Sequence, residues 1–213
     1  MIEFAAVVVG SYLIGSIPFG LVLGRLKGVD VRAYGSGKTG TTNVLRTLGT
    51  RYAALALAGD IIKGVAAILL ARYILESHTG EMAAGFAAIA GHDWSIFIKF
   101  GGGRGVATSG GALFAMAMPA PMVAVACIGF FILVVALSRY ASLGSLLGSL
   151  GAVAMMGAFL ALDWVPWQYL VYVGVAVALI VFQHRDNITR LLSGKESKVG
   201  EKGQKRESGA HDE

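Results

Sequence analysis

The chain has 213 residues, of which 55% are hydrophobic and only 15% are charged, and its mean hydropathy is +0.68. Because soluble domains carry about 25% charged residues, this composition indicates an integral membrane protein. It excludes a soluble enzyme, a disordered chain and a fibre. The net charge of +5 fits the basic cytoplasmic loops of a membrane protein better than nucleic-acid binding. The single cysteine, Cys127, can form no internal disulfide.

Apolar runs follow one another along the chain and predict an all-α fold. A helix needs about 20 residues to cross a bilayer, and the runs cover residues 4–23, 52–75, 82–98, 106–137, 143–162 and 166–182. The fourth run is too long for one crossing and contains Pro119 and Pro121, which interrupt a helix. Dividing it at these prolines predicts seven transmembrane helices, some of them short.

Basic residues predict the orientation, because lysine and arginine gather on the cytoplasmic side of a membrane protein. They fill the first connection, flank the glycines of the third, occupy the fifth at Arg139 and recur after residue 182. This pattern places the N-terminus outside and the C-terminus in the cytoplasm. Arg72 lies near the opposite end, where its long side chain can reach the interface. Six crossings would place Arg139 outside.

The chain divides by composition into two parts. Residues 1–192 are expected to form a single polytopic membrane domain. Residues 193–213 carry five basic and five acidic side chains without an apolar period, which predicts a flexible, charged cytoplasmic tail.

Three polar stretches share the predicted cytoplasmic side. They are GSGKTGTTN at 35–43, GGGRGVAT at 101–108 and HRDNI at 184–188. Glycine allows backbone amides to close around an anion, and nearby arginines supply charge and a bidentate fork. Each stretch alone fits a flexible basic loop equally well, but together they predict one phosphate-binding site.

Several familiar enzyme patterns do not apply. Residues 35–40 match GxGxxG and residues 37–39 match the end of a P-loop, but both motifs need a preceding β-strand and here a transmembrane helix precedes them. The P-loop also needs a glycine where the chain has Arg32. No aspartate has a histidine five residues before it, and neither a GxSxG elbow nor metal-ligand spacing occurs. We therefore expect a mechanism without metal, cofactor or catalytic triad.

In their order and spacing, the motifs resemble the bacterial acyl-phosphate:glycerol-3-phosphate acyltransferase family (PlsY). The resemblance runs from about residue 10 to 198. The matching pieces are GSIPFG at 15–20, GSG at 35–37, GTTNV at 40–44 with Arg46, Asp60 with Lys63 and Gly64, GH at 91–92, GGRGVAT at 102–108, Arg139 with SLGS at 142–145, HRDNI at 184–188, RLL at 190–192 and GKE at 194–196.

The resemblance implies an enzyme of the bacterial inner membrane with its active site on the cytoplasmic side. It would transfer an acyl group from acyl phosphate directly to glycerol 3-phosphate, giving 1-acyl-glycerol-3-phosphate (lysophosphatidic acid), the first step of phospholipid biosynthesis. Its expected partners are both substrates, the lipid bilayer and an upstream enzyme that forms acyl phosphate; no nucleic acid is expected.

Two residues depart from the family pattern. Lys38 stands where asparagine is usual, and Arg104 stands where lysine is usual. Both changes keep or add positive charge, but lysine and arginine differ in geometry, a difference that bears on turnover and substrate preference. Lys38 is expected either to bind phosphate or to remain a solvated cation.

The phosphate groups are expected to bind Arg46 and Arg104, with the Ser36 hydroxyl and the backbone of Gly102 and Gly103 completing the cradle. Arginine suits this task because its planar fork matches phosphate oxygens.

The substrate oxygens are expected to be oriented by Asn43, Ser142 and Asn187. His184 is the histidine that could accept the hydroxyl proton, although a substrate phosphate could do so equally well and leave His184 as a positioning residue. The expected catalytic set is thus His184, Asn187, Ser142 and Arg104.

A second set of residues is expected to support the site from inside the bundle. Asp60 and Lys63 are separated by three residues in the second span, and intramembrane charges are functional candidates by default. We interpret them as an ion pair that braces the site, with His92 in a similar structural role.

A small transporter for phosphate-type anions is the alternative. It would need polar residues that continue across several spans, and only Asp60 and Lys63 supply them.

Overall fold

The computed structural model describes residues 1–116 and 119–206, which form α-helices and short 3-10 helices with isolated β-bridges only. The N-terminal half contains α1 (Ile2–Gly15), α2 (Phe19–Arg25), η1 (Val31–Ala33), α3 (Thr41–Leu48), α4 (Thr50–Leu75) and α5 (His78–Asp93). The C-terminal half contains η2 (Ile96–Ile98), α6 (Val106–Ala115), α7 (Ala120–Ser138), α8 (Ala141–Ala161), α9 (Trp167–Gln183) and α10 (Arg185–Leu192).

The all-α membrane fold is confirmed. By length and hydropathy, four segments of the described chain can cross a membrane: Ile2–Arg25, Thr50–Leu75, Ala120–Ser138 and Ala141–Ala161. The bent pair formed by α9 and α10, which meet at 59°, is a fifth candidate. The count of seven crossings and the orientation stay predictions.

The long run at 106–137 divides near its prolines, as expected. α6 ends at Ala115 and α7 begins at Ala120, with Pro121 in the first turn, a position where a missing N–H costs nothing. Residues 117–118 of the expected break lie outside the described chain.

Two other expected spans differ in their limits. The first apolar run is interrupted between α1 and α2 because Pro18 cannot continue the helical hydrogen bonds. The third helix ends at Asp93 instead of continuing to residue 98, and the apolar residues that follow form the short helix η2.

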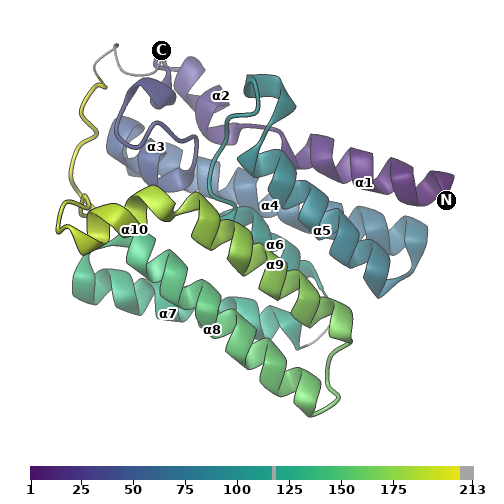
Figure 1. The fold of residues 1–213 in the computed structure, drawn as a ribbon. Coiled ribbons are helices and arrows are strands. Elements are labelled where there is room, and N and C mark those ends of the chain that lie inside the picture. The colour runs from purple at the N-terminus through teal and green to yellow at the C-terminus, as the bar shows by residue number, and fades with distance from the viewer. Residues whose placement is uncertain (117–118, 207–213) are drawn as a thin grey trace.

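Close glycine contacts bring the helices of the N-terminal half together. A Cβ at Gly15 would strike the backbone of Ala88, and a Cβ at Gly64 would strike the backbone of Thr108. α1 therefore lies directly against α5, and α4 against α6 (Figure 1). Such approaches are common in membrane proteins, where van der Waals packing between small residues drives helix association.

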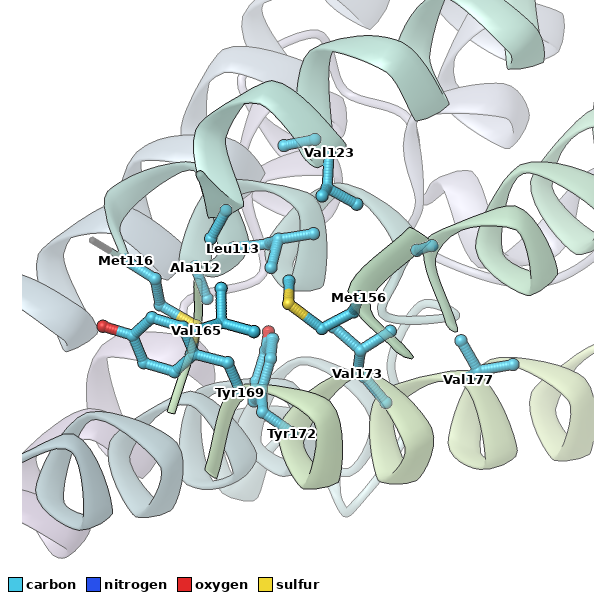
Figure 2. Packing of buried hydrophobic residues seen from close by; sticks show 14 of the residues in the cluster. Ala112, Leu113, Met116, Val123, Met156, Val165, Tyr169, Tyr172, Val173 and Val177 are labelled. Carbon is cyan, nitrogen blue, oxygen red and sulfur yellow. The ribbon is translucent and has the colours of Figure 1, made fainter. Parts of the chain in front are cut away.

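The largest apolar core fills the space among α6, α8 and α9. Figure 2 shows Leu113 of α6, Met156 of α8 and Tyr172 of α9 pointing toward one another. The Tyr172 hydroxyl donates to the Ser109 carbonyl over 3.0 Å, so its buried polar tip is satisfied. This core fixes the direction of α9, whose far end carries His184.

The C-terminal residues pass across one end of the bundle, from α10 toward α2 and α3 (Figure 1). We call residues 195–206 the C-terminal strap. Its backbone pairs with three earlier segments through Val199 N to Arg139 O (2.8 Å), Gly203 N to Arg46 O (3.1 Å), Gly35 N to Gln204 O (2.9 Å) and Arg206 N to Ala33 O (2.8 Å). The boundary expected at residue 193 stays a prediction, and residues 207–213 of the expected tail lie outside the described chain.

Candidate functional site

A small pocket lies where α9 bends into α10, close to the beginnings of α3 and α8. It is lined by Thr42, Arg46, Arg104, Ala141, Ser142, Ser145, His184, Asn187 and Glu196. All three polar stretches singled out in the sequence contribute to this lining. The structure thus brings together five of the expected site residues, namely Arg46, Arg104, Ser142, His184 and Asn187; their roles stay predictions.

The carboxylate of Glu196 organises one wall of the pocket. Its Oε1 accepts hydrogen bonds from Ser142 Oγ (2.8 Å) and Asn187 Nδ2 (2.7 Å), and its Oε2 accepts from Arg190 Nε (2.7 Å). Burial raises the pKa of Glu196, but these hydrogen bonds outweigh burial and the pKa falls below its usual value. The carboxylate is therefore ionised and fixes the side chains of Ser142 and Asn187.

Asn187 keeps one polar atom available. Its Nδ2 is held by Glu196, while its Oδ1 is buried and has no hydrogen-bond partner. A buried acceptor without a partner costs about 1–3 kcal/mol, which a ligand hydroxyl could offset. The geometry therefore favours Asn187 as an acceptor for a substrate O–H.

Two arginines supply the positive charge of the pocket. Arg46 Nη2 donates to the Ser197 carbonyl over 2.8 Å, but its Nε is buried without a partner. Arg104 Nε is also buried and unpartnered. Burial, and next the charge of Arg190, lower the pKa of Arg104 to about 10, so its guanidinium group stays charged at neutral pH. Free donors on buried cations suit a phosphate.

His184 occupies the corner between α9 and α10 and is 2% exposed. Its Nδ1 lies 2.8 Å from the Ile180 carbonyl, a contact that assigns the ring proton to Nδ1 and leaves Nε2 as an acceptor. Burial, and next the charge of Arg104, lower the pKa of His184 to about 4. The imidazole is therefore neutral at physiological pH.

Asn43 lies outside the lining of the pocket, and its expected role in orienting substrate oxygens stays a prediction. Its Nδ2 donates to the carbonyls of Val31 and Lys38, both over 2.8 Å, and its Oδ1 accepts from the Ser36 amide over 3.0 Å. All these groups belong to the loop that precedes α3. Asn43 therefore holds this loop in shape through three hydrogen bonds. The buried Ser36 hydroxyl has no hydrogen-bond partner.

The glycines of the second stretch pack against the end of α5. The Gly103 amide donates to the His92 carbonyl over 3.0 Å, and the Gly102 carbonyl accepts from the Thr39 amide over 3.3 Å. A Cβ at either glycine would collide with His92. The two glycine-rich loops are thus joined to each other, and the Gly103 amide expected in the phosphate cradle is engaged by the protein itself.

The expected ion pair within the bundle is present. Lys63 Nζ lies 2.8 Å from Asp60 Oδ1, and His92 Nδ1 lies 3.4 Å from the same oxygen. Lys63 also donates to the carbonyl of Ile17 over 3.1 Å, at the break between α1 and α2. Because the His92 ring abuts Gly103, this buried cluster connects the helix break to the second glycine-rich loop.

Four lining residues were absent from the expected site: Thr42, Ala141, Ser145 and Glu196. Ser145 follows Ser142 by three residues and so shares its helix face, a signal available in the sequence. Glu196 lay in a segment whose balanced charges predicted solvent, although it ends the GKE piece at 194–196 that matches the family pattern. Its burial follows from the path of the strap.

Comparisons with known proteins show which family the chain is similar to. Residues 5–194 match the family model described as glycerol-3-phosphate acyltransferase. The chain is 44% identical to glycerol-3-phosphate acyltransferase 3 of Dehalococcoides mccartyi over 209 residues, covering 92% of this chain and 95% of the relative. It is 46% identical to glycerol-3-phosphate acyltransferase 2 of Moorella thermoacetica over 194 residues, covering 90% and 95%.

Two solved structures are also similar. The crystal structure of PlsY, an integral membrane glycerol 3-phosphate acyltransferase, in its glycerol 3-phosphate form has a TM-score of 0.83 and 38% identity, and the match covers 92% of this chain and 96% of that one. Its lysophosphatidic acid form has a TM-score of 0.80 and 36% identity, with coverage of 92% and 94%.

Proposed function

The chain belongs to the glycerol-3-phosphate acyltransferase family, and from this premise we propose that it takes its acyl group from an acyl phosphate. The acceptor is glycerol 3-phosphate and the product is lysophosphatidic acid, the two compounds whose complexes are known for the similar solved enzyme. The observation that carries the proposal is the meeting of Arg46, Arg104, His184 and Asn187 in one pocket. Both substrates carry a phosphate, and the pocket offers two half-buried arginines whose buried Nε–H groups have no partner in the protein.

The two arginines hold the substrates. Their unpartnered Nε–H groups bind phosphate oxygens, and their charge stabilises the negative charge that develops on the leaving phosphate. An acyl phosphate is a mixed anhydride with a good leaving group, so no acyl-enzyme is needed. Holding the two reactants together supplies most of the rate enhancement.

The reaction is a direct displacement. The 1-hydroxyl oxygen of glycerol 3-phosphate attacks the acyl carbonyl carbon, the bond between that carbon and the phosphate oxygen breaks, and inorganic phosphate leaves with the proton. His184, with a pKa of about 4, is a weaker base than a phosphate group with a second pKa near 6. His184 Nε2 and Asn187 Oδ1 therefore orient the hydroxyl, and a substrate phosphate accepts its proton.

The proposed location is the bacterial inner membrane with the pocket on the cytoplasmic side. The basic residues of the first connection and of the C-terminal region support this orientation. An upstream acyl-phosphate-forming enzyme would deliver the donor on the same side.

The donor assay tests the proposal. Purified protein in lipid is given glycerol 3-phosphate with acyl phosphate, acyl-CoA or acyl carrier protein, and lysophosphatidic acid and inorganic phosphate are measured. We expect product with acyl phosphate alone, at a rate that a metal chelator leaves unchanged. Arg104→Ala protein is the matched control for background transfer. Equal product formation from acyl-CoA would refute the proposed donor.

A further inference from the structure

A closed loop of residues 95–101, which we call the apolar loop, connects α5 to the second glycine-rich stretch. Its exposed side chains are almost all apolar: Ile96 is 50%, Phe97 59% and Phe100 62% exposed. Ile98 points the other way and is buried. A tight loop that presents three large apolar side chains outward marks an interaction site and not a random connection.

The backbone of the apolar loop is held in a costly conformation. Lys99 and Phe100 have φ values of 54° and 58°, the left-handed region, which costs a residue with a Cβ roughly 1–2 kcal/mol. The conformation turns the chain so that Phe100 stands outside the loop while Ile98 stays in the protein.

The apolar loop also satisfies most of its own amide groups. The carbonyl of Ser95 accepts from Ile98 N (3.2 Å) and Phe100 N (2.8 Å), and the Ser95 hydroxyl accepts from Phe97 N (3.3 Å). Ser95 N donates to Gly101 O over 2.9 Å, and Gly101 N donates to Ile98 O over 3.1 Å. Non-helical backbone tolerates a membrane interior only when its polar groups are paired within the protein, and this loop meets that condition to a large extent.

The apolar loop is attached to a membrane-spanning segment. The Ser95 hydroxyl donates to the Ser16 carbonyl over 2.6 Å, and the Tyr12 hydroxyl donates to the Trp94 carbonyl over 2.8 Å. Ser16 lies inside the candidate span Ile2–Arg25, next to the exposed Ile17. The loop is thus fixed by two hydrogen bonds to a segment that is long and apolar enough to cross a membrane.

We propose that the apolar loop is inserted into the acyl-chain region of the leaflet on the side of the pocket. Ile96, Phe97 and Phe100 contact lipid hydrocarbon, and the ammonium group of Lys99 reaches the headgroups. Gly101 closes the loop and begins the stretch that carries Arg104. Insertion of the loop therefore fixes the depth of Arg104 relative to the lipid surface.

Site-directed spin labelling in liposomes tests the insertion without any substrate, so its outcome does not depend on the acyl donor. Phe97→Cys and Phe100→Cys are labelled in a Cys127→Ser background, and collision with oxygen is compared with collision with a water-soluble nickel chelate. Ile132→Cys on the exposed face of α7 and Lys202→Cys in the C-terminal strap serve as lipid and water references.

We expect both loop positions to match Ile132→Cys, with strong oxygen and weak nickel collision. Nickel collision at the level of Lys202→Cys would overturn the proposal, because the loop would then lie in water. Weak collision with both reagents would also overturn it, since a protein surface would then cover the loop. If a phenylalanine variant does not fold, Ile96→Cys reports the same surface.

Discussion

The two ends of α9 lie beside two clusters of charged side chains: the cluster around Glu81 is hydrogen-bonded within the protein, whereas the pocket keeps buried charged and polar atoms without partners. At the beginning of α9, the carboxylate of Glu81 accepts from Arg72 Nε and from the Tyr169 hydroxyl, both over 2.6 Å. At its end, roughly 22 Å away at about 1.5 Å per residue, Arg104 and Asn187 keep buried atoms without partners.

The difference separates a structural polar cluster from a binding site. Arg72 also donates to the Ala115 carbonyl over 2.7 Å, so the Glu81 cluster joins α4, α5, α6 and α9 and needs nothing further. The pocket end holds its cations and acceptors in fixed positions but leaves part of their hydrogen-bonding capacity for a ligand.

Arg104→Ala should have the largest effect. Loss of a half-buried cation that binds phosphate should lower kcat/KM for acyl transfer by about 100-fold or more, with little loss of thermal stability. Arg104→Lys, which keeps the charge without the fork, should retain a larger share of activity. Wild-type kinetics in Arg104→Ala protein would remove this residue from the site.

Glu81→Gln, at the other end of α9, should lower the stability of the protein and leave substrate binding unchanged. Weakening two hydrogen bonds to a buried carboxylate should destabilise the protein by about 2–3 kcal/mol, seen as a lower Tm in detergent. The KM for glycerol 3-phosphate should not change, because the cluster lies far from the pocket. A raised KM with an unchanged Tm would contradict the division into two roles.

His184 should make the pocket end sensitive to acid. The folded-state pKa is about 4 and the unfolded value is about 6.5, so the unfolded chain binds a proton first as pH falls. The stabilisation is present above the unfolded pKa, and about 2 kcal/mol of it is lost between pH 7 and pH 5.

Thermal unfolding of the wild type and His184→Gln at both pH values measures this effect. The variant has no imidazole to titrate, so its Tm should fall less between pH 7 and pH 5. Parallel pH profiles for the two proteins would show that another group is responsible.

Removal of residues 199–213 should have the smallest effect. It deletes the strap hydrogen bonds to Gly35, Ala33, Arg46 and Arg139. Those to Gly35 and Ala33 support the first glycine-rich loop, and none of the deleted residues contacts a substrate in the proposed reaction. We expect the KM for glycerol 3-phosphate to rise about threefold, within the range of one net hydrogen bond, with kcat unchanged. A lower kcat at constant KM would instead assign the strap to the chemical step.

The sequence predicted the helical fold and the meeting of distant loops because both depend on patterns of residue type. Apolar length predicted the helices, and clusters of charge with glycine, or of histidine with asparagine, predicted the loops around Arg46, Arg104 and His184. The helix end at Asp93 was not predicted, because the apolar residues at 96–98 have the composition of a span and differ only in their local hydrogen bonds.

The direction of individual hydrogen bonds was beyond the sequence. Asn43 and Asn187 are the same residue type in similar contexts, yet one amide is used up by its own loop and the other keeps a free oxygen. Glu196 shows the same limit, since its role depends on the strap returning to the pocket. Partner choice of this kind is decided by tertiary geometry.

The glycine contacts bear on how a mutational scan of this enzyme should be interpreted. Alanine at Gly15, Gly91, Gly64 or Gly111 would press a methyl group into the backbone of the adjacent helix, a steric collision with no direct connection to acyl transfer. Such positions would score as intolerant as the arginines of the pocket. Loss of function alone would therefore mix two classes of residue, and a measure of protein abundance beside each activity value would distinguish them.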